Sequence, residues 1–181
     1  MESLDLSSWE RERCCAFTGH RPDKLPSGYR QSPAACAPLS AALRRAILQA
    51  GRDGCDTFLS GMALGSDTLA AEEVLALKAE GRPFRLIAVI PCPEQDARWK
   101  EPDRERYRSL LARADGRICV CPQYTPSCMH IRNRWLVEHA RRLIAVFDGS
   151  PGGTANTVRL AAKMHREIVQ ISPSAPDAFL I

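Results

Sequence analysis

The chain carries little excess charge, few aromatic side chains and no long apolar run. Its 25 Lys and Arg residues against 21 Asp and Glu residues leave a net charge of +4. That charge suits an anionic ligand but falls short of the concentrated basic surface that duplex nucleic acid requires. Aromatic residues make up 6% of the sequence and form no base-stacking ladder, which argues against tight binding of a single strand. The composition therefore disfavours a nucleic-acid partner.

The first residues, MESLDLSSWERERCC, mix both charges and contain no continuous apolar segment, so neither a signal peptide nor a membrane span is predicted. We expect a cytoplasmic protein that does not bind membranes, with its eight cysteines mostly reduced. Cys14, Cys15, Cys119 and Cys121 lie in apolar runs and are expected to be buried packing residues. Cys119, Cys121 and Cys128 have no His or fourth Cys at ligand spacing, so no metal site is expected.

Familiar catalytic and nucleotide-binding signatures are also missing. The P-loop pattern Gly-x-x-x-x-Gly-Lys-Ser/Thr is absent, and Thr18-Gly19-His20-Arg21 stands where a dinucleotide-binding Gly-x-Gly-x-x-Gly would follow the first strand. No Ser-His-Asp, Cys-His or zinc-protease arrangement is present. The candidates for a catalytic carboxylate are Asp67, whose simplest role is to cap a helix, and Asp148, placed to orient a ribose hydroxyl or a water.

Apolar runs alternate with segments of helical periodicity along the whole sequence. This order predicts an α/β protein with a Rossmann-like open parallel sheet of about six strands and helices on both faces. Gly51 and Gly81 stand where two of the helices are expected to end. We divide the chain into an N-terminal extension (1–13), one domain (14–173) and a C-terminal tail (174–181). The expected strands are 14–19, 56–61, 84–91, 117–122, 142–149 and 167–173.

Polar, glycine-rich residues follow several of these strands, at the edge where parallel α/β sheets bind ligands. Backbone N–H groups at a helix N-terminus bind phosphate, and glycine lets the phosphate come close to the chain. Tight packing at a strand-to-helix corner is the other interpretation of each glycine-rich segment, and it stays open here. The two segments are Gly152, Gly153 and Thr154 after the fifth strand, and Ser60, Gly61, Gly65 and Asp67 after the second.

Two further groups could contribute charge to such a site. His20 and Arg21 follow the first strand, where an anion is expected to bind. Arg21 would offer the paired donors of its guanidinium, and histidine is a side chain that can change its charge near neutral pH. Arg132 and Asn133 lie near the start of the helix before the fifth strand, and a solvated basic helix face explains their charge pattern equally well.

Four segments carry a family resemblance: AFTGHRP (16–22), SGMALGSD (60–67), CMHIRNRWLVEHARRLIAVFDG (128–149) and GGTANTVRLA (152–161). They resemble the YpsA-like family of the SLOG superfamily, which also contains the LOG nucleotide phosphoribohydrolases and the DNA-processing protein DprA. The resemblance covers about residues 14–171. It implies a Rossmann-like domain that binds or senses a nucleotide-type ligand such as ADP-ribose, NAD or AMP, and relatives that commonly form homo-oligomers. The implied ligand contacts are Thr18, Gly19, His20, Arg21, Ser60, Gly61, Gly65, Asp67, Arg132, Asn133, Gly152, Gly153 and Thr154, to which Asp148 is added from its place after the fifth strand.

One departure from the LOG branch bears on activity. LOG enzymes share a Pro-Gly-Gly-x-Gly-Thr-x-x-Glu motif whose Glu takes part in cleaving the N-glycosidic bond, and here Arg159 stands in its place. Arg stays protonated and cannot serve as a general base. The resemblance thus favours a nucleotide-binding protein. The alternatives are an N-glycosidic hydrolase or transferase that uses Asp67 or Asp148, and a DNA-processing adaptor of the DprA type.

Overall fold

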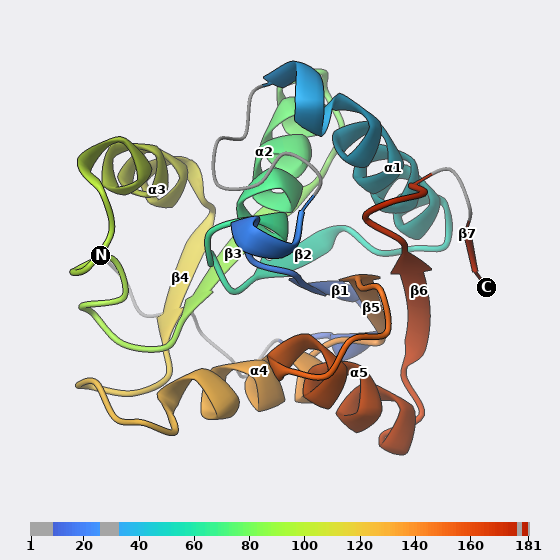
Figure 1. Ribbon diagram of the computed structural model, residues 1–181. Coiled ribbons are helices and arrows are strands. Elements are labelled where there is room, and N and C mark those ends of the chain that lie inside the picture. Colours follow the sequence, from blue (N-terminus) through green and yellow to red (C-terminus); the bar gives the residue numbers. More distant parts are fainter. Residues whose placement is uncertain (1–8, 26–32, 177–178, 181) are drawn as a thin grey trace.

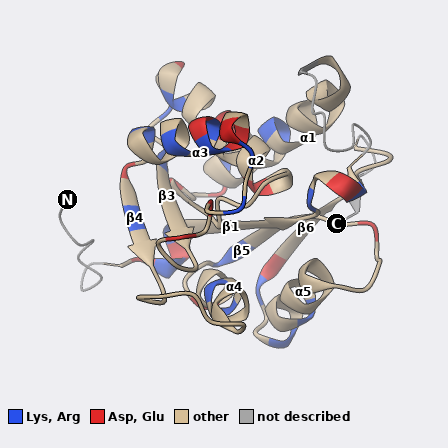
Figure 2. Ribbon diagram, turned by 60° about the vertical axis from the view of Figure 1, so that its left-hand side comes forward, with Lys and Arg blue, Asp and Glu red and all other residues tan. Residues whose placement is uncertain are grey.

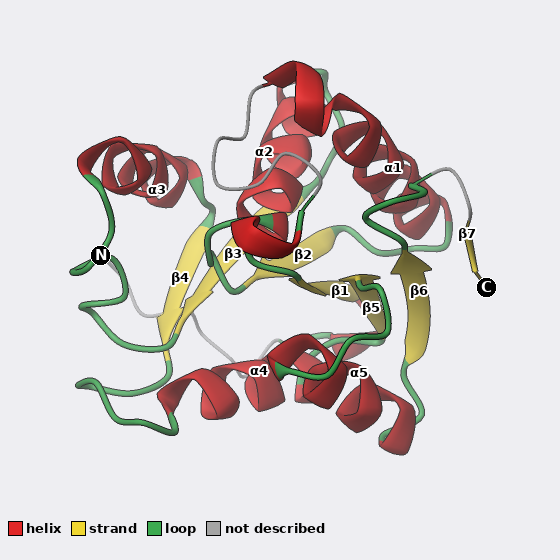
Figure 3. Cartoon of the chain, viewed as in Figure 1, coloured by secondary structure: helices red, strands yellow, loops and turns green. Residues whose placement is uncertain are grey.

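The computed structural model describes residues 9–25, 33–176 and 179–180 of the chain. Within these residues, one sheet has the strand order β4-β3-β2-β1-β5-β6-β7. The first six strands along the chain pair in parallel, and β7 pairs antiparallel with β6. The predicted α/β class and open parallel sheet are therefore confirmed, and the short antiparallel strand at one edge is an addition that the sequence pattern did not predict (Figure 3).

The helices alternate with the strands in the order that the sequence predicted (Figure 1). The strands are β1 (Cys14–Gly19), β2 (Thr57–Ser60), β3 (Arg85–Ile90), β4 (Gly116–Cys119), β5 (Arg142–Val146), β6 (Glu167–Ile171) and β7 (Phe179–Leu180). The helices are α1 (Pro33–Arg52), α2 (Ser66–Ala79), α3 (Glu101–Arg113), α4 (Cys128–Glu138) and α5 (Gly153–Lys163), with short 3₁₀ turns at η2 (Arg11–Arg13) and η3 (Pro22–Lys24).

Helices α1, α2 and α3 cover one face of the sheet, and α4 and α5 cover the other (Figure 1). Because successive side chains of a strand point to opposite faces, the apolar strands feed two separate cores. In β1, Cys15 and Phe17 join the core beneath α1 and α2, whereas Cys14 and Ala16 join the core above α4 and α5. Both faces of the central strands are thus buried, as their uninterrupted apolar runs predict.

Two local expectations from the sequence were wrong. Gly51 does not end α1 but lies inside it, against the ring of Phe84; the glycine with positive φ beyond this helix is Gly54. Gly81, by contrast, does adopt positive φ just after α2. Cys119 is exposed because β4 is the edge strand of the sheet, and the pattern of its apolar run did not reveal that position.

The order of the strands creates a divergence between β1 and β5. The chain leaves β1 toward α1 on one face and leaves β5 toward α5 on the other, so the two connections separate above adjacent strand ends (Figure 1). Ligands of open α/β sheets bind in the crevice at such a switch point. In the described part of the chain, none of the helices has both the length and the apolar character needed to cross a membrane.

Candidate functional site

A cavity of about 240 Å³ lies at this divergence. Its wall comes from the end of β1 and the η3 turn, the starts of α2, α4 and α5, and the loop between β5 and α5. Ten of the residues that the sequence nominated line it together: Thr18, Gly19, His20, Arg21, Asp67, Arg132, Asn133, Gly152, Gly153 and Thr154. The structure thus brings four separate segments of the chain to one place.

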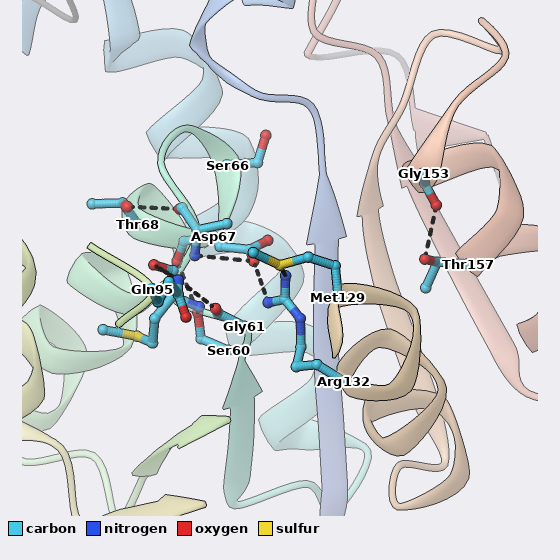
Figure 4. Close-up of polar contacts among 12 residues, drawn as sticks. Ser60, Gly61, Ser66, Asp67, Thr68, Gln95, Met129, Arg132, Gly153 and Thr157 are labelled. Carbon is cyan, nitrogen blue, oxygen red and sulfur yellow. Dashed lines mark hydrogen bonds and ion pairs between the residues drawn. The ribbon is translucent and has the colours of Figure 1, made fainter. Parts of the chain in front are cut away.

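The first turn of α5 forms one end of the cavity. Gly152 precedes the helix with φ of 149°, and no side chain in the described part of the chain caps the helix start. Thr157 donates its hydroxyl to the carbonyl of Gly153 at 2.9 Å, which holds the first turn closed (Figure 4). The first backbone N–H groups of a helix have no partner within the helix and sit at the positive end of its dipole. This end of the cavity is therefore suited to an anion.

Cations from η3 and the preceding loop lie beside this helix start. Arg21 and Lys24 both line the cavity, and the Lys24 ammonium donates to the hydroxyl of Ser150 at 3.0 Å. That contact joins the loop after β1 to the loop after β5. A single neutral hydroxyl leaves most of the charge on the ammonium uncompensated, so it adds to the positive potential at the helix start.

A second contact between the same two loops involves His20 and Asp148. The His20 ring is buried, and its Nε2 lies 2.7 Å from a carboxylate oxygen of Asp148. The same oxygen accepts the backbone N–H of Ser150 at 2.8 Å. Hydrogen bonds from Ser150, and to a lesser extent from His20, hold the pKa of Asp148 below its ordinary value. Asp148 itself does not line the cavity and acts on it through His20.

The floor of the cavity contains a buried ion pair between α2 and α4. The Nη1 atom of Arg132 lies 3.3 Å from Asp67 Oδ2, and the two side chains are only 4% and 7% exposed (Figure 4). Burial raises the pKa of Asp67 against the opposing charges of Arg132 and Arg21. Burial likewise lowers the pKa of Arg132, against the attraction of Asp67. Burial is the largest influence on the pKa of each member of the pair.

Arg132 is incompletely satisfied by the protein. Its Nε atom is buried and has no hydrogen-bond partner among the described residues, and its Nη2 contacts only the sulfur of Met129, at 4.0 Å. An unpaired guanidinium nitrogen is costly in a dry environment. Arg132 therefore keeps donor capacity beside the cavity after it has paired with Asp67.

The glycines after β2 serve this packing rather than line the cavity. A Cβ atom on Gly61 would overlap Nη1 of Arg132, so only glycine lets the guanidinium reach Asp67. Gly65 has φ of 99° and lies so close to the chain at His20 that a Cβ would be 2.6 Å from the His20 carbonyl oxygen. Ser60 accepts the backbone N–H of Met62 and donates to the carbonyl of Asp67.

Three backbone N–H groups of the segment after β2, where a second phosphate cradle was expected, are bonded within the protein. The N–H of Met62 is bonded to Ser60, that of Ala63 to Asp67, and that of Ser66 to the carbonyl of His20. Of the nominated residues, Ser60, Gly61, Gly65 and Asp148 do not line the cavity. Their hydrogen bonds and close contacts instead fix the residues that form the wall.

Several residues that the sequence did not nominate also line the cavity. Those with polar side chains are Asp23, Lys24, His130 and Ser150, and each lies within or beside a nominated segment. Gln95 lies elsewhere: its amide donates to the carbonyls of Gly61 and Met62 at 3.2 and 2.8 Å and so holds the loop after β2. No motif marks Gln95 in the sequence, because its role depends on a fold that brings the β3–α3 loop against the β2–α2 loop.

Arg159, which occupies the place of the LOG glutamate, is turned along its own helix. Its guanidinium donates to the side chain of Asn156 and to the carbonyl of Ala155. It does not line the cavity. Within residues 9–25, 33–176 and 179–180, no group of three or more His, Cys, Asp or Glu residues is placed to hold a metal ion.

Charge is distributed without one dominant sign over the visible part of the fold. Figure 2 shows basic and acidic residues close together along the α2 and α3 region. Ion pairs such as Arg106 with Glu72 and Arg44 with Glu73 account for part of this mixing. The cavity wall itself holds Arg21, Lys24 and Arg132 together with Asp23 and Asp67.

Comparison with solved structures shows the fold class of this chain. A Helicobacter pylori DNA processing protein A, solved in a study of its single-stranded DNA binding, superposes with a TM-score of 0.58 at 18% identity, over 92% of this chain and 68% of the other. DNA processing protein A from Streptococcus pneumoniae gives a TM-score of 0.58 at 17% identity, over 88% of this chain and 50% of the other. The fold is a Rossmann-like domain of the kind that these proteins contain.

Sequence comparison narrows the class to a family. The model of the YpsA family, described as "YspA SLOG family", matches residues 15–173. A protein of Bacillus thuringiensis named "UPF0398 protein" is 30% identical over 155 residues, which cover 84% of each chain. The chain belongs to the YpsA family of SLOG proteins.

Proposed function

We propose that this protein binds a nucleotide or nucleotide-sugar phosphate, of the ADP-ribose, NAD or AMP type, in the cavity between β1 and β5. The observation that carries the proposal is the uncapped start of α5, with Gly153 and Thr154 in the same cavity wall as Arg21, Lys24 and the incompletely satisfied Arg132. In proteins, phosphate accepts hydrogen bonds from backbone N–H groups at helix starts and from the side chains of Arg and Lys. The mild net charge limits attraction for longer polyanions, which favours a small ligand.

The direct test removes one backbone donor and uses a matched control for the side chain that is lost with it. Thr154 is the second residue of α5, and Pro102 already occupies the second position of α3, so proline at this place is compatible with a helix start in this chain. Thr154→Pro deletes the N–H, whereas the matched control Thr154→Ala keeps it and removes only the side chain. A hydrogen bond to a charged group contributes about 1.5–3 kcal/mol, so Thr154→Pro should weaken binding roughly tenfold or more.

Isothermal titration calorimetry with ADP-ribose, NAD and AMP measures this difference. We expect at least one of the three to bind, with affinity lost in Thr154→Pro and largely kept in Thr154→Ala. Circular dichroism of both variants checks that α5 and the rest of the fold are intact. The proposal fails if none of the three ligands binds the folded protein, or if both variants bind as the parent does.

A further inference from the structure

His20 and Asp148 form a histidine–carboxylate dyad at the edge of the cavity. The Nε2 atom of His20 lies 2.7 Å from Asp148 Oδ1, and the Ser150 N–H holds that oxygen from the other side at 2.8 Å. The ring also lies against Phe147, with 5.7 Å between the centroids. The orientation of the imidazole is thus set by a carboxylate, a backbone donor that fixes the carboxylate, and an apolar neighbour.

The charge of Asp148 decides which nitrogen of His20 carries the proton. Hydrogen bonds from Ser150 and His20 lower the pKa of Asp148, so the carboxylate is ionised near neutral pH and can only accept hydrogen bonds. A nitrogen 2.7 Å away must therefore be the donor, which places the proton of the neutral ring on Nε2. In the opposite tautomer the same nitrogen would accept the backbone N–H of Asp148 at 3.2 Å, so the shorter contact with the charged carboxylate decides the assignment.

The other ring nitrogen, Nδ1, then carries a lone pair. No described residue forms a hydrogen bond with it, and His20 lines the cavity. An imidazole in a cavity wall with one nitrogen held by a carboxylate and the other without a protein partner can act as a general base. The dyad thus has a chemical capacity that phosphate binding alone does not require.

The remaining groups in the wall indicate which bond such a base would attack. The α5 start, Arg21 and Lys24 gather positive charge where the phosphate would lie, and such donors stabilise charge that develops on a transferring phosphoryl group. Attack at a sugar carbon would instead call for a carboxylate facing that carbon. Asp67 is paired with Arg132 and Asp148 with His20, and the third carboxylate, Asp23, lies on the η3 turn beside Lys24. The cations at the α5 start therefore favour attack on phosphorus.

We infer that His20 is the general base, and Asp148 its positioning residue, for hydrolysis of a phosphoanhydride bond in a nucleotide held in this cavity. The inference rests on the proposed function. Nδ1 takes a proton from water while the water oxygen forms a bond to phosphorus. The bond from that phosphorus to the bridging oxygen breaks, and its electron pair leaves with the second phosphate. The imidazolium returns its proton to solvent, and the products are two phosphomonoesters.

ADP-ribose is the probe for this reaction, since cleavage of its anhydride gives AMP and ribose 5-phosphate. Anion-exchange chromatography of the products and calorimetry of binding are run on the parent, on His20→Gln and on the control His165→Gln at an exposed position near the end of α5. General-base catalysis contributes about 10²–10⁴-fold, so His20→Gln should lower kcat about 100-fold or more with binding nearly unchanged. His165→Gln should match the parent.

Two further measurements separate chemistry from folding. Imidazole added to His20→Ala should restore part of the activity, which a merely structural histidine would not allow. Asp148→Asn should lower kcat and leave KM nearly unchanged, because the ring loses its orienting carboxylate while the phosphate contacts stay. In H₂¹⁸O, the label should appear on a product phosphate.

The outcomes distinguish this inference from the binding proposal. ADP-ribose that binds the parent without release of AMP overturns the hydrolytic inference and leaves the binding proposal standing. Release of free adenine shows attack at a different bond and overturns it as well. If His20→Gln hydrolyses ADP-ribose at the parent rate, His20 is not the general base and the inference is overturned. If none of ADP-ribose, NAD and AMP binds, the proposed function fails and this inference fails with it.

Discussion

Removing the guanidinium of Arg132 should destabilise the protein in a strongly pH-dependent way. Arg132→Met keeps a long side chain in the same space but leaves Asp67 buried without its closest cation, with the more distant Arg21 and the N–H of Ala63 opposing the effect of burial. A buried carboxylate that loses its partner takes up a proton rather than remain charged. The folded variant then holds a proton that the unfolded chain releases above its ordinary pKa of about 3.9.

The magnitude follows from that difference in proton binding. One pH unit corresponds to about 1.36 kcal/mol, so holding the proton at pH 7, about three units above the ordinary value, costs up to about 4 kcal/mol relative to a parent with ionised Asp67. At pH 5 the same step costs only about 1.5 kcal/mol. The stability lost through this substitution therefore grows as pH rises. For a chain of this length, the melting temperature should fall by about 8–16 °C at pH 7 and by about 3–6 °C at pH 5.

Thermal and urea unfolding followed by circular dichroism at both pH values measures the effect. Asp67→Asn combined with Arg132→Met removes the titrating group, so the double variant should be more stable than Arg132→Met at pH 7 and should lose the pH dependence. Arg134→Met on the exposed side of the same helix is the control, because its surface pair with Glu138 contributes at most about 1 kcal/mol. Equal destabilisation of Arg132→Met at pH 5 and pH 7 would refute the reasoning, since Asp67 would then have stayed ionised.

Three further substitutions test the packing and the dyad. Gly61→Ala should cost up to about 3–5 kcal/mol by forcing Arg132 off its carboxylate, and much less when combined with Arg132→Met; additive costs in urea unfolding would contradict the contact. Gly51→Ala should destabilise by about 1–3 kcal/mol although alanine favours helices, because its Cβ would lie 2.6 Å from the Phe84 ring; a raised melting temperature would show that the ring yields easily. A carboxyl whose pKa is lowered by folding stabilises the fold above its ordinary value and loses that effect as pH falls below about 4. Asp148→Asn should therefore flatten the acid side of the stability curve, and an unchanged acid transition would show that this carboxyl does not contribute.

The architecture was predictable because the signal for it is local. Runs such as residues 84–91 are apolar on both faces, which only a strand covered by two helix layers explains, and the alternation of such runs with periodic segments fixes a parallel sheet. The place of the cavity followed from topology, since strand ends in a parallel sheet meet at one edge. β7 was missed because two residues that pair with an edge strand leave no periodic pattern.

The internal chemistry of the site was less accessible, because it depends on contacts between distant segments. Arg132 looked in the sequence like a residue of a solvated helix face, and only the packing of α4 shows that it reaches Asp67, 65 positions earlier. Gly61 and Gly65 carried the right signal, a need for glycine, but the sequence could not say whether a phosphate or the protein itself comes close. His20 was nominated for its charge, whereas its hydrogen bond to Asp148 depends on the pairing of β1 with β5.

The close approach of Gly61 and Arg132 has a consequence for how this site can change over time. A side chain at position 61 and a guanidinium at position 132 exclude one another, so neither position is free to drift while the other stays fixed. A side chain at position 61 can be accommodated only after Arg132 is replaced by a shorter residue. That replacement opens the space at position 61 and at the same time leaves Asp67 without its cation. Substitutions at positions 61, 67 and 132 should therefore occur together in evolution. A related sequence that has replaced one of these three residues should have replaced the other two.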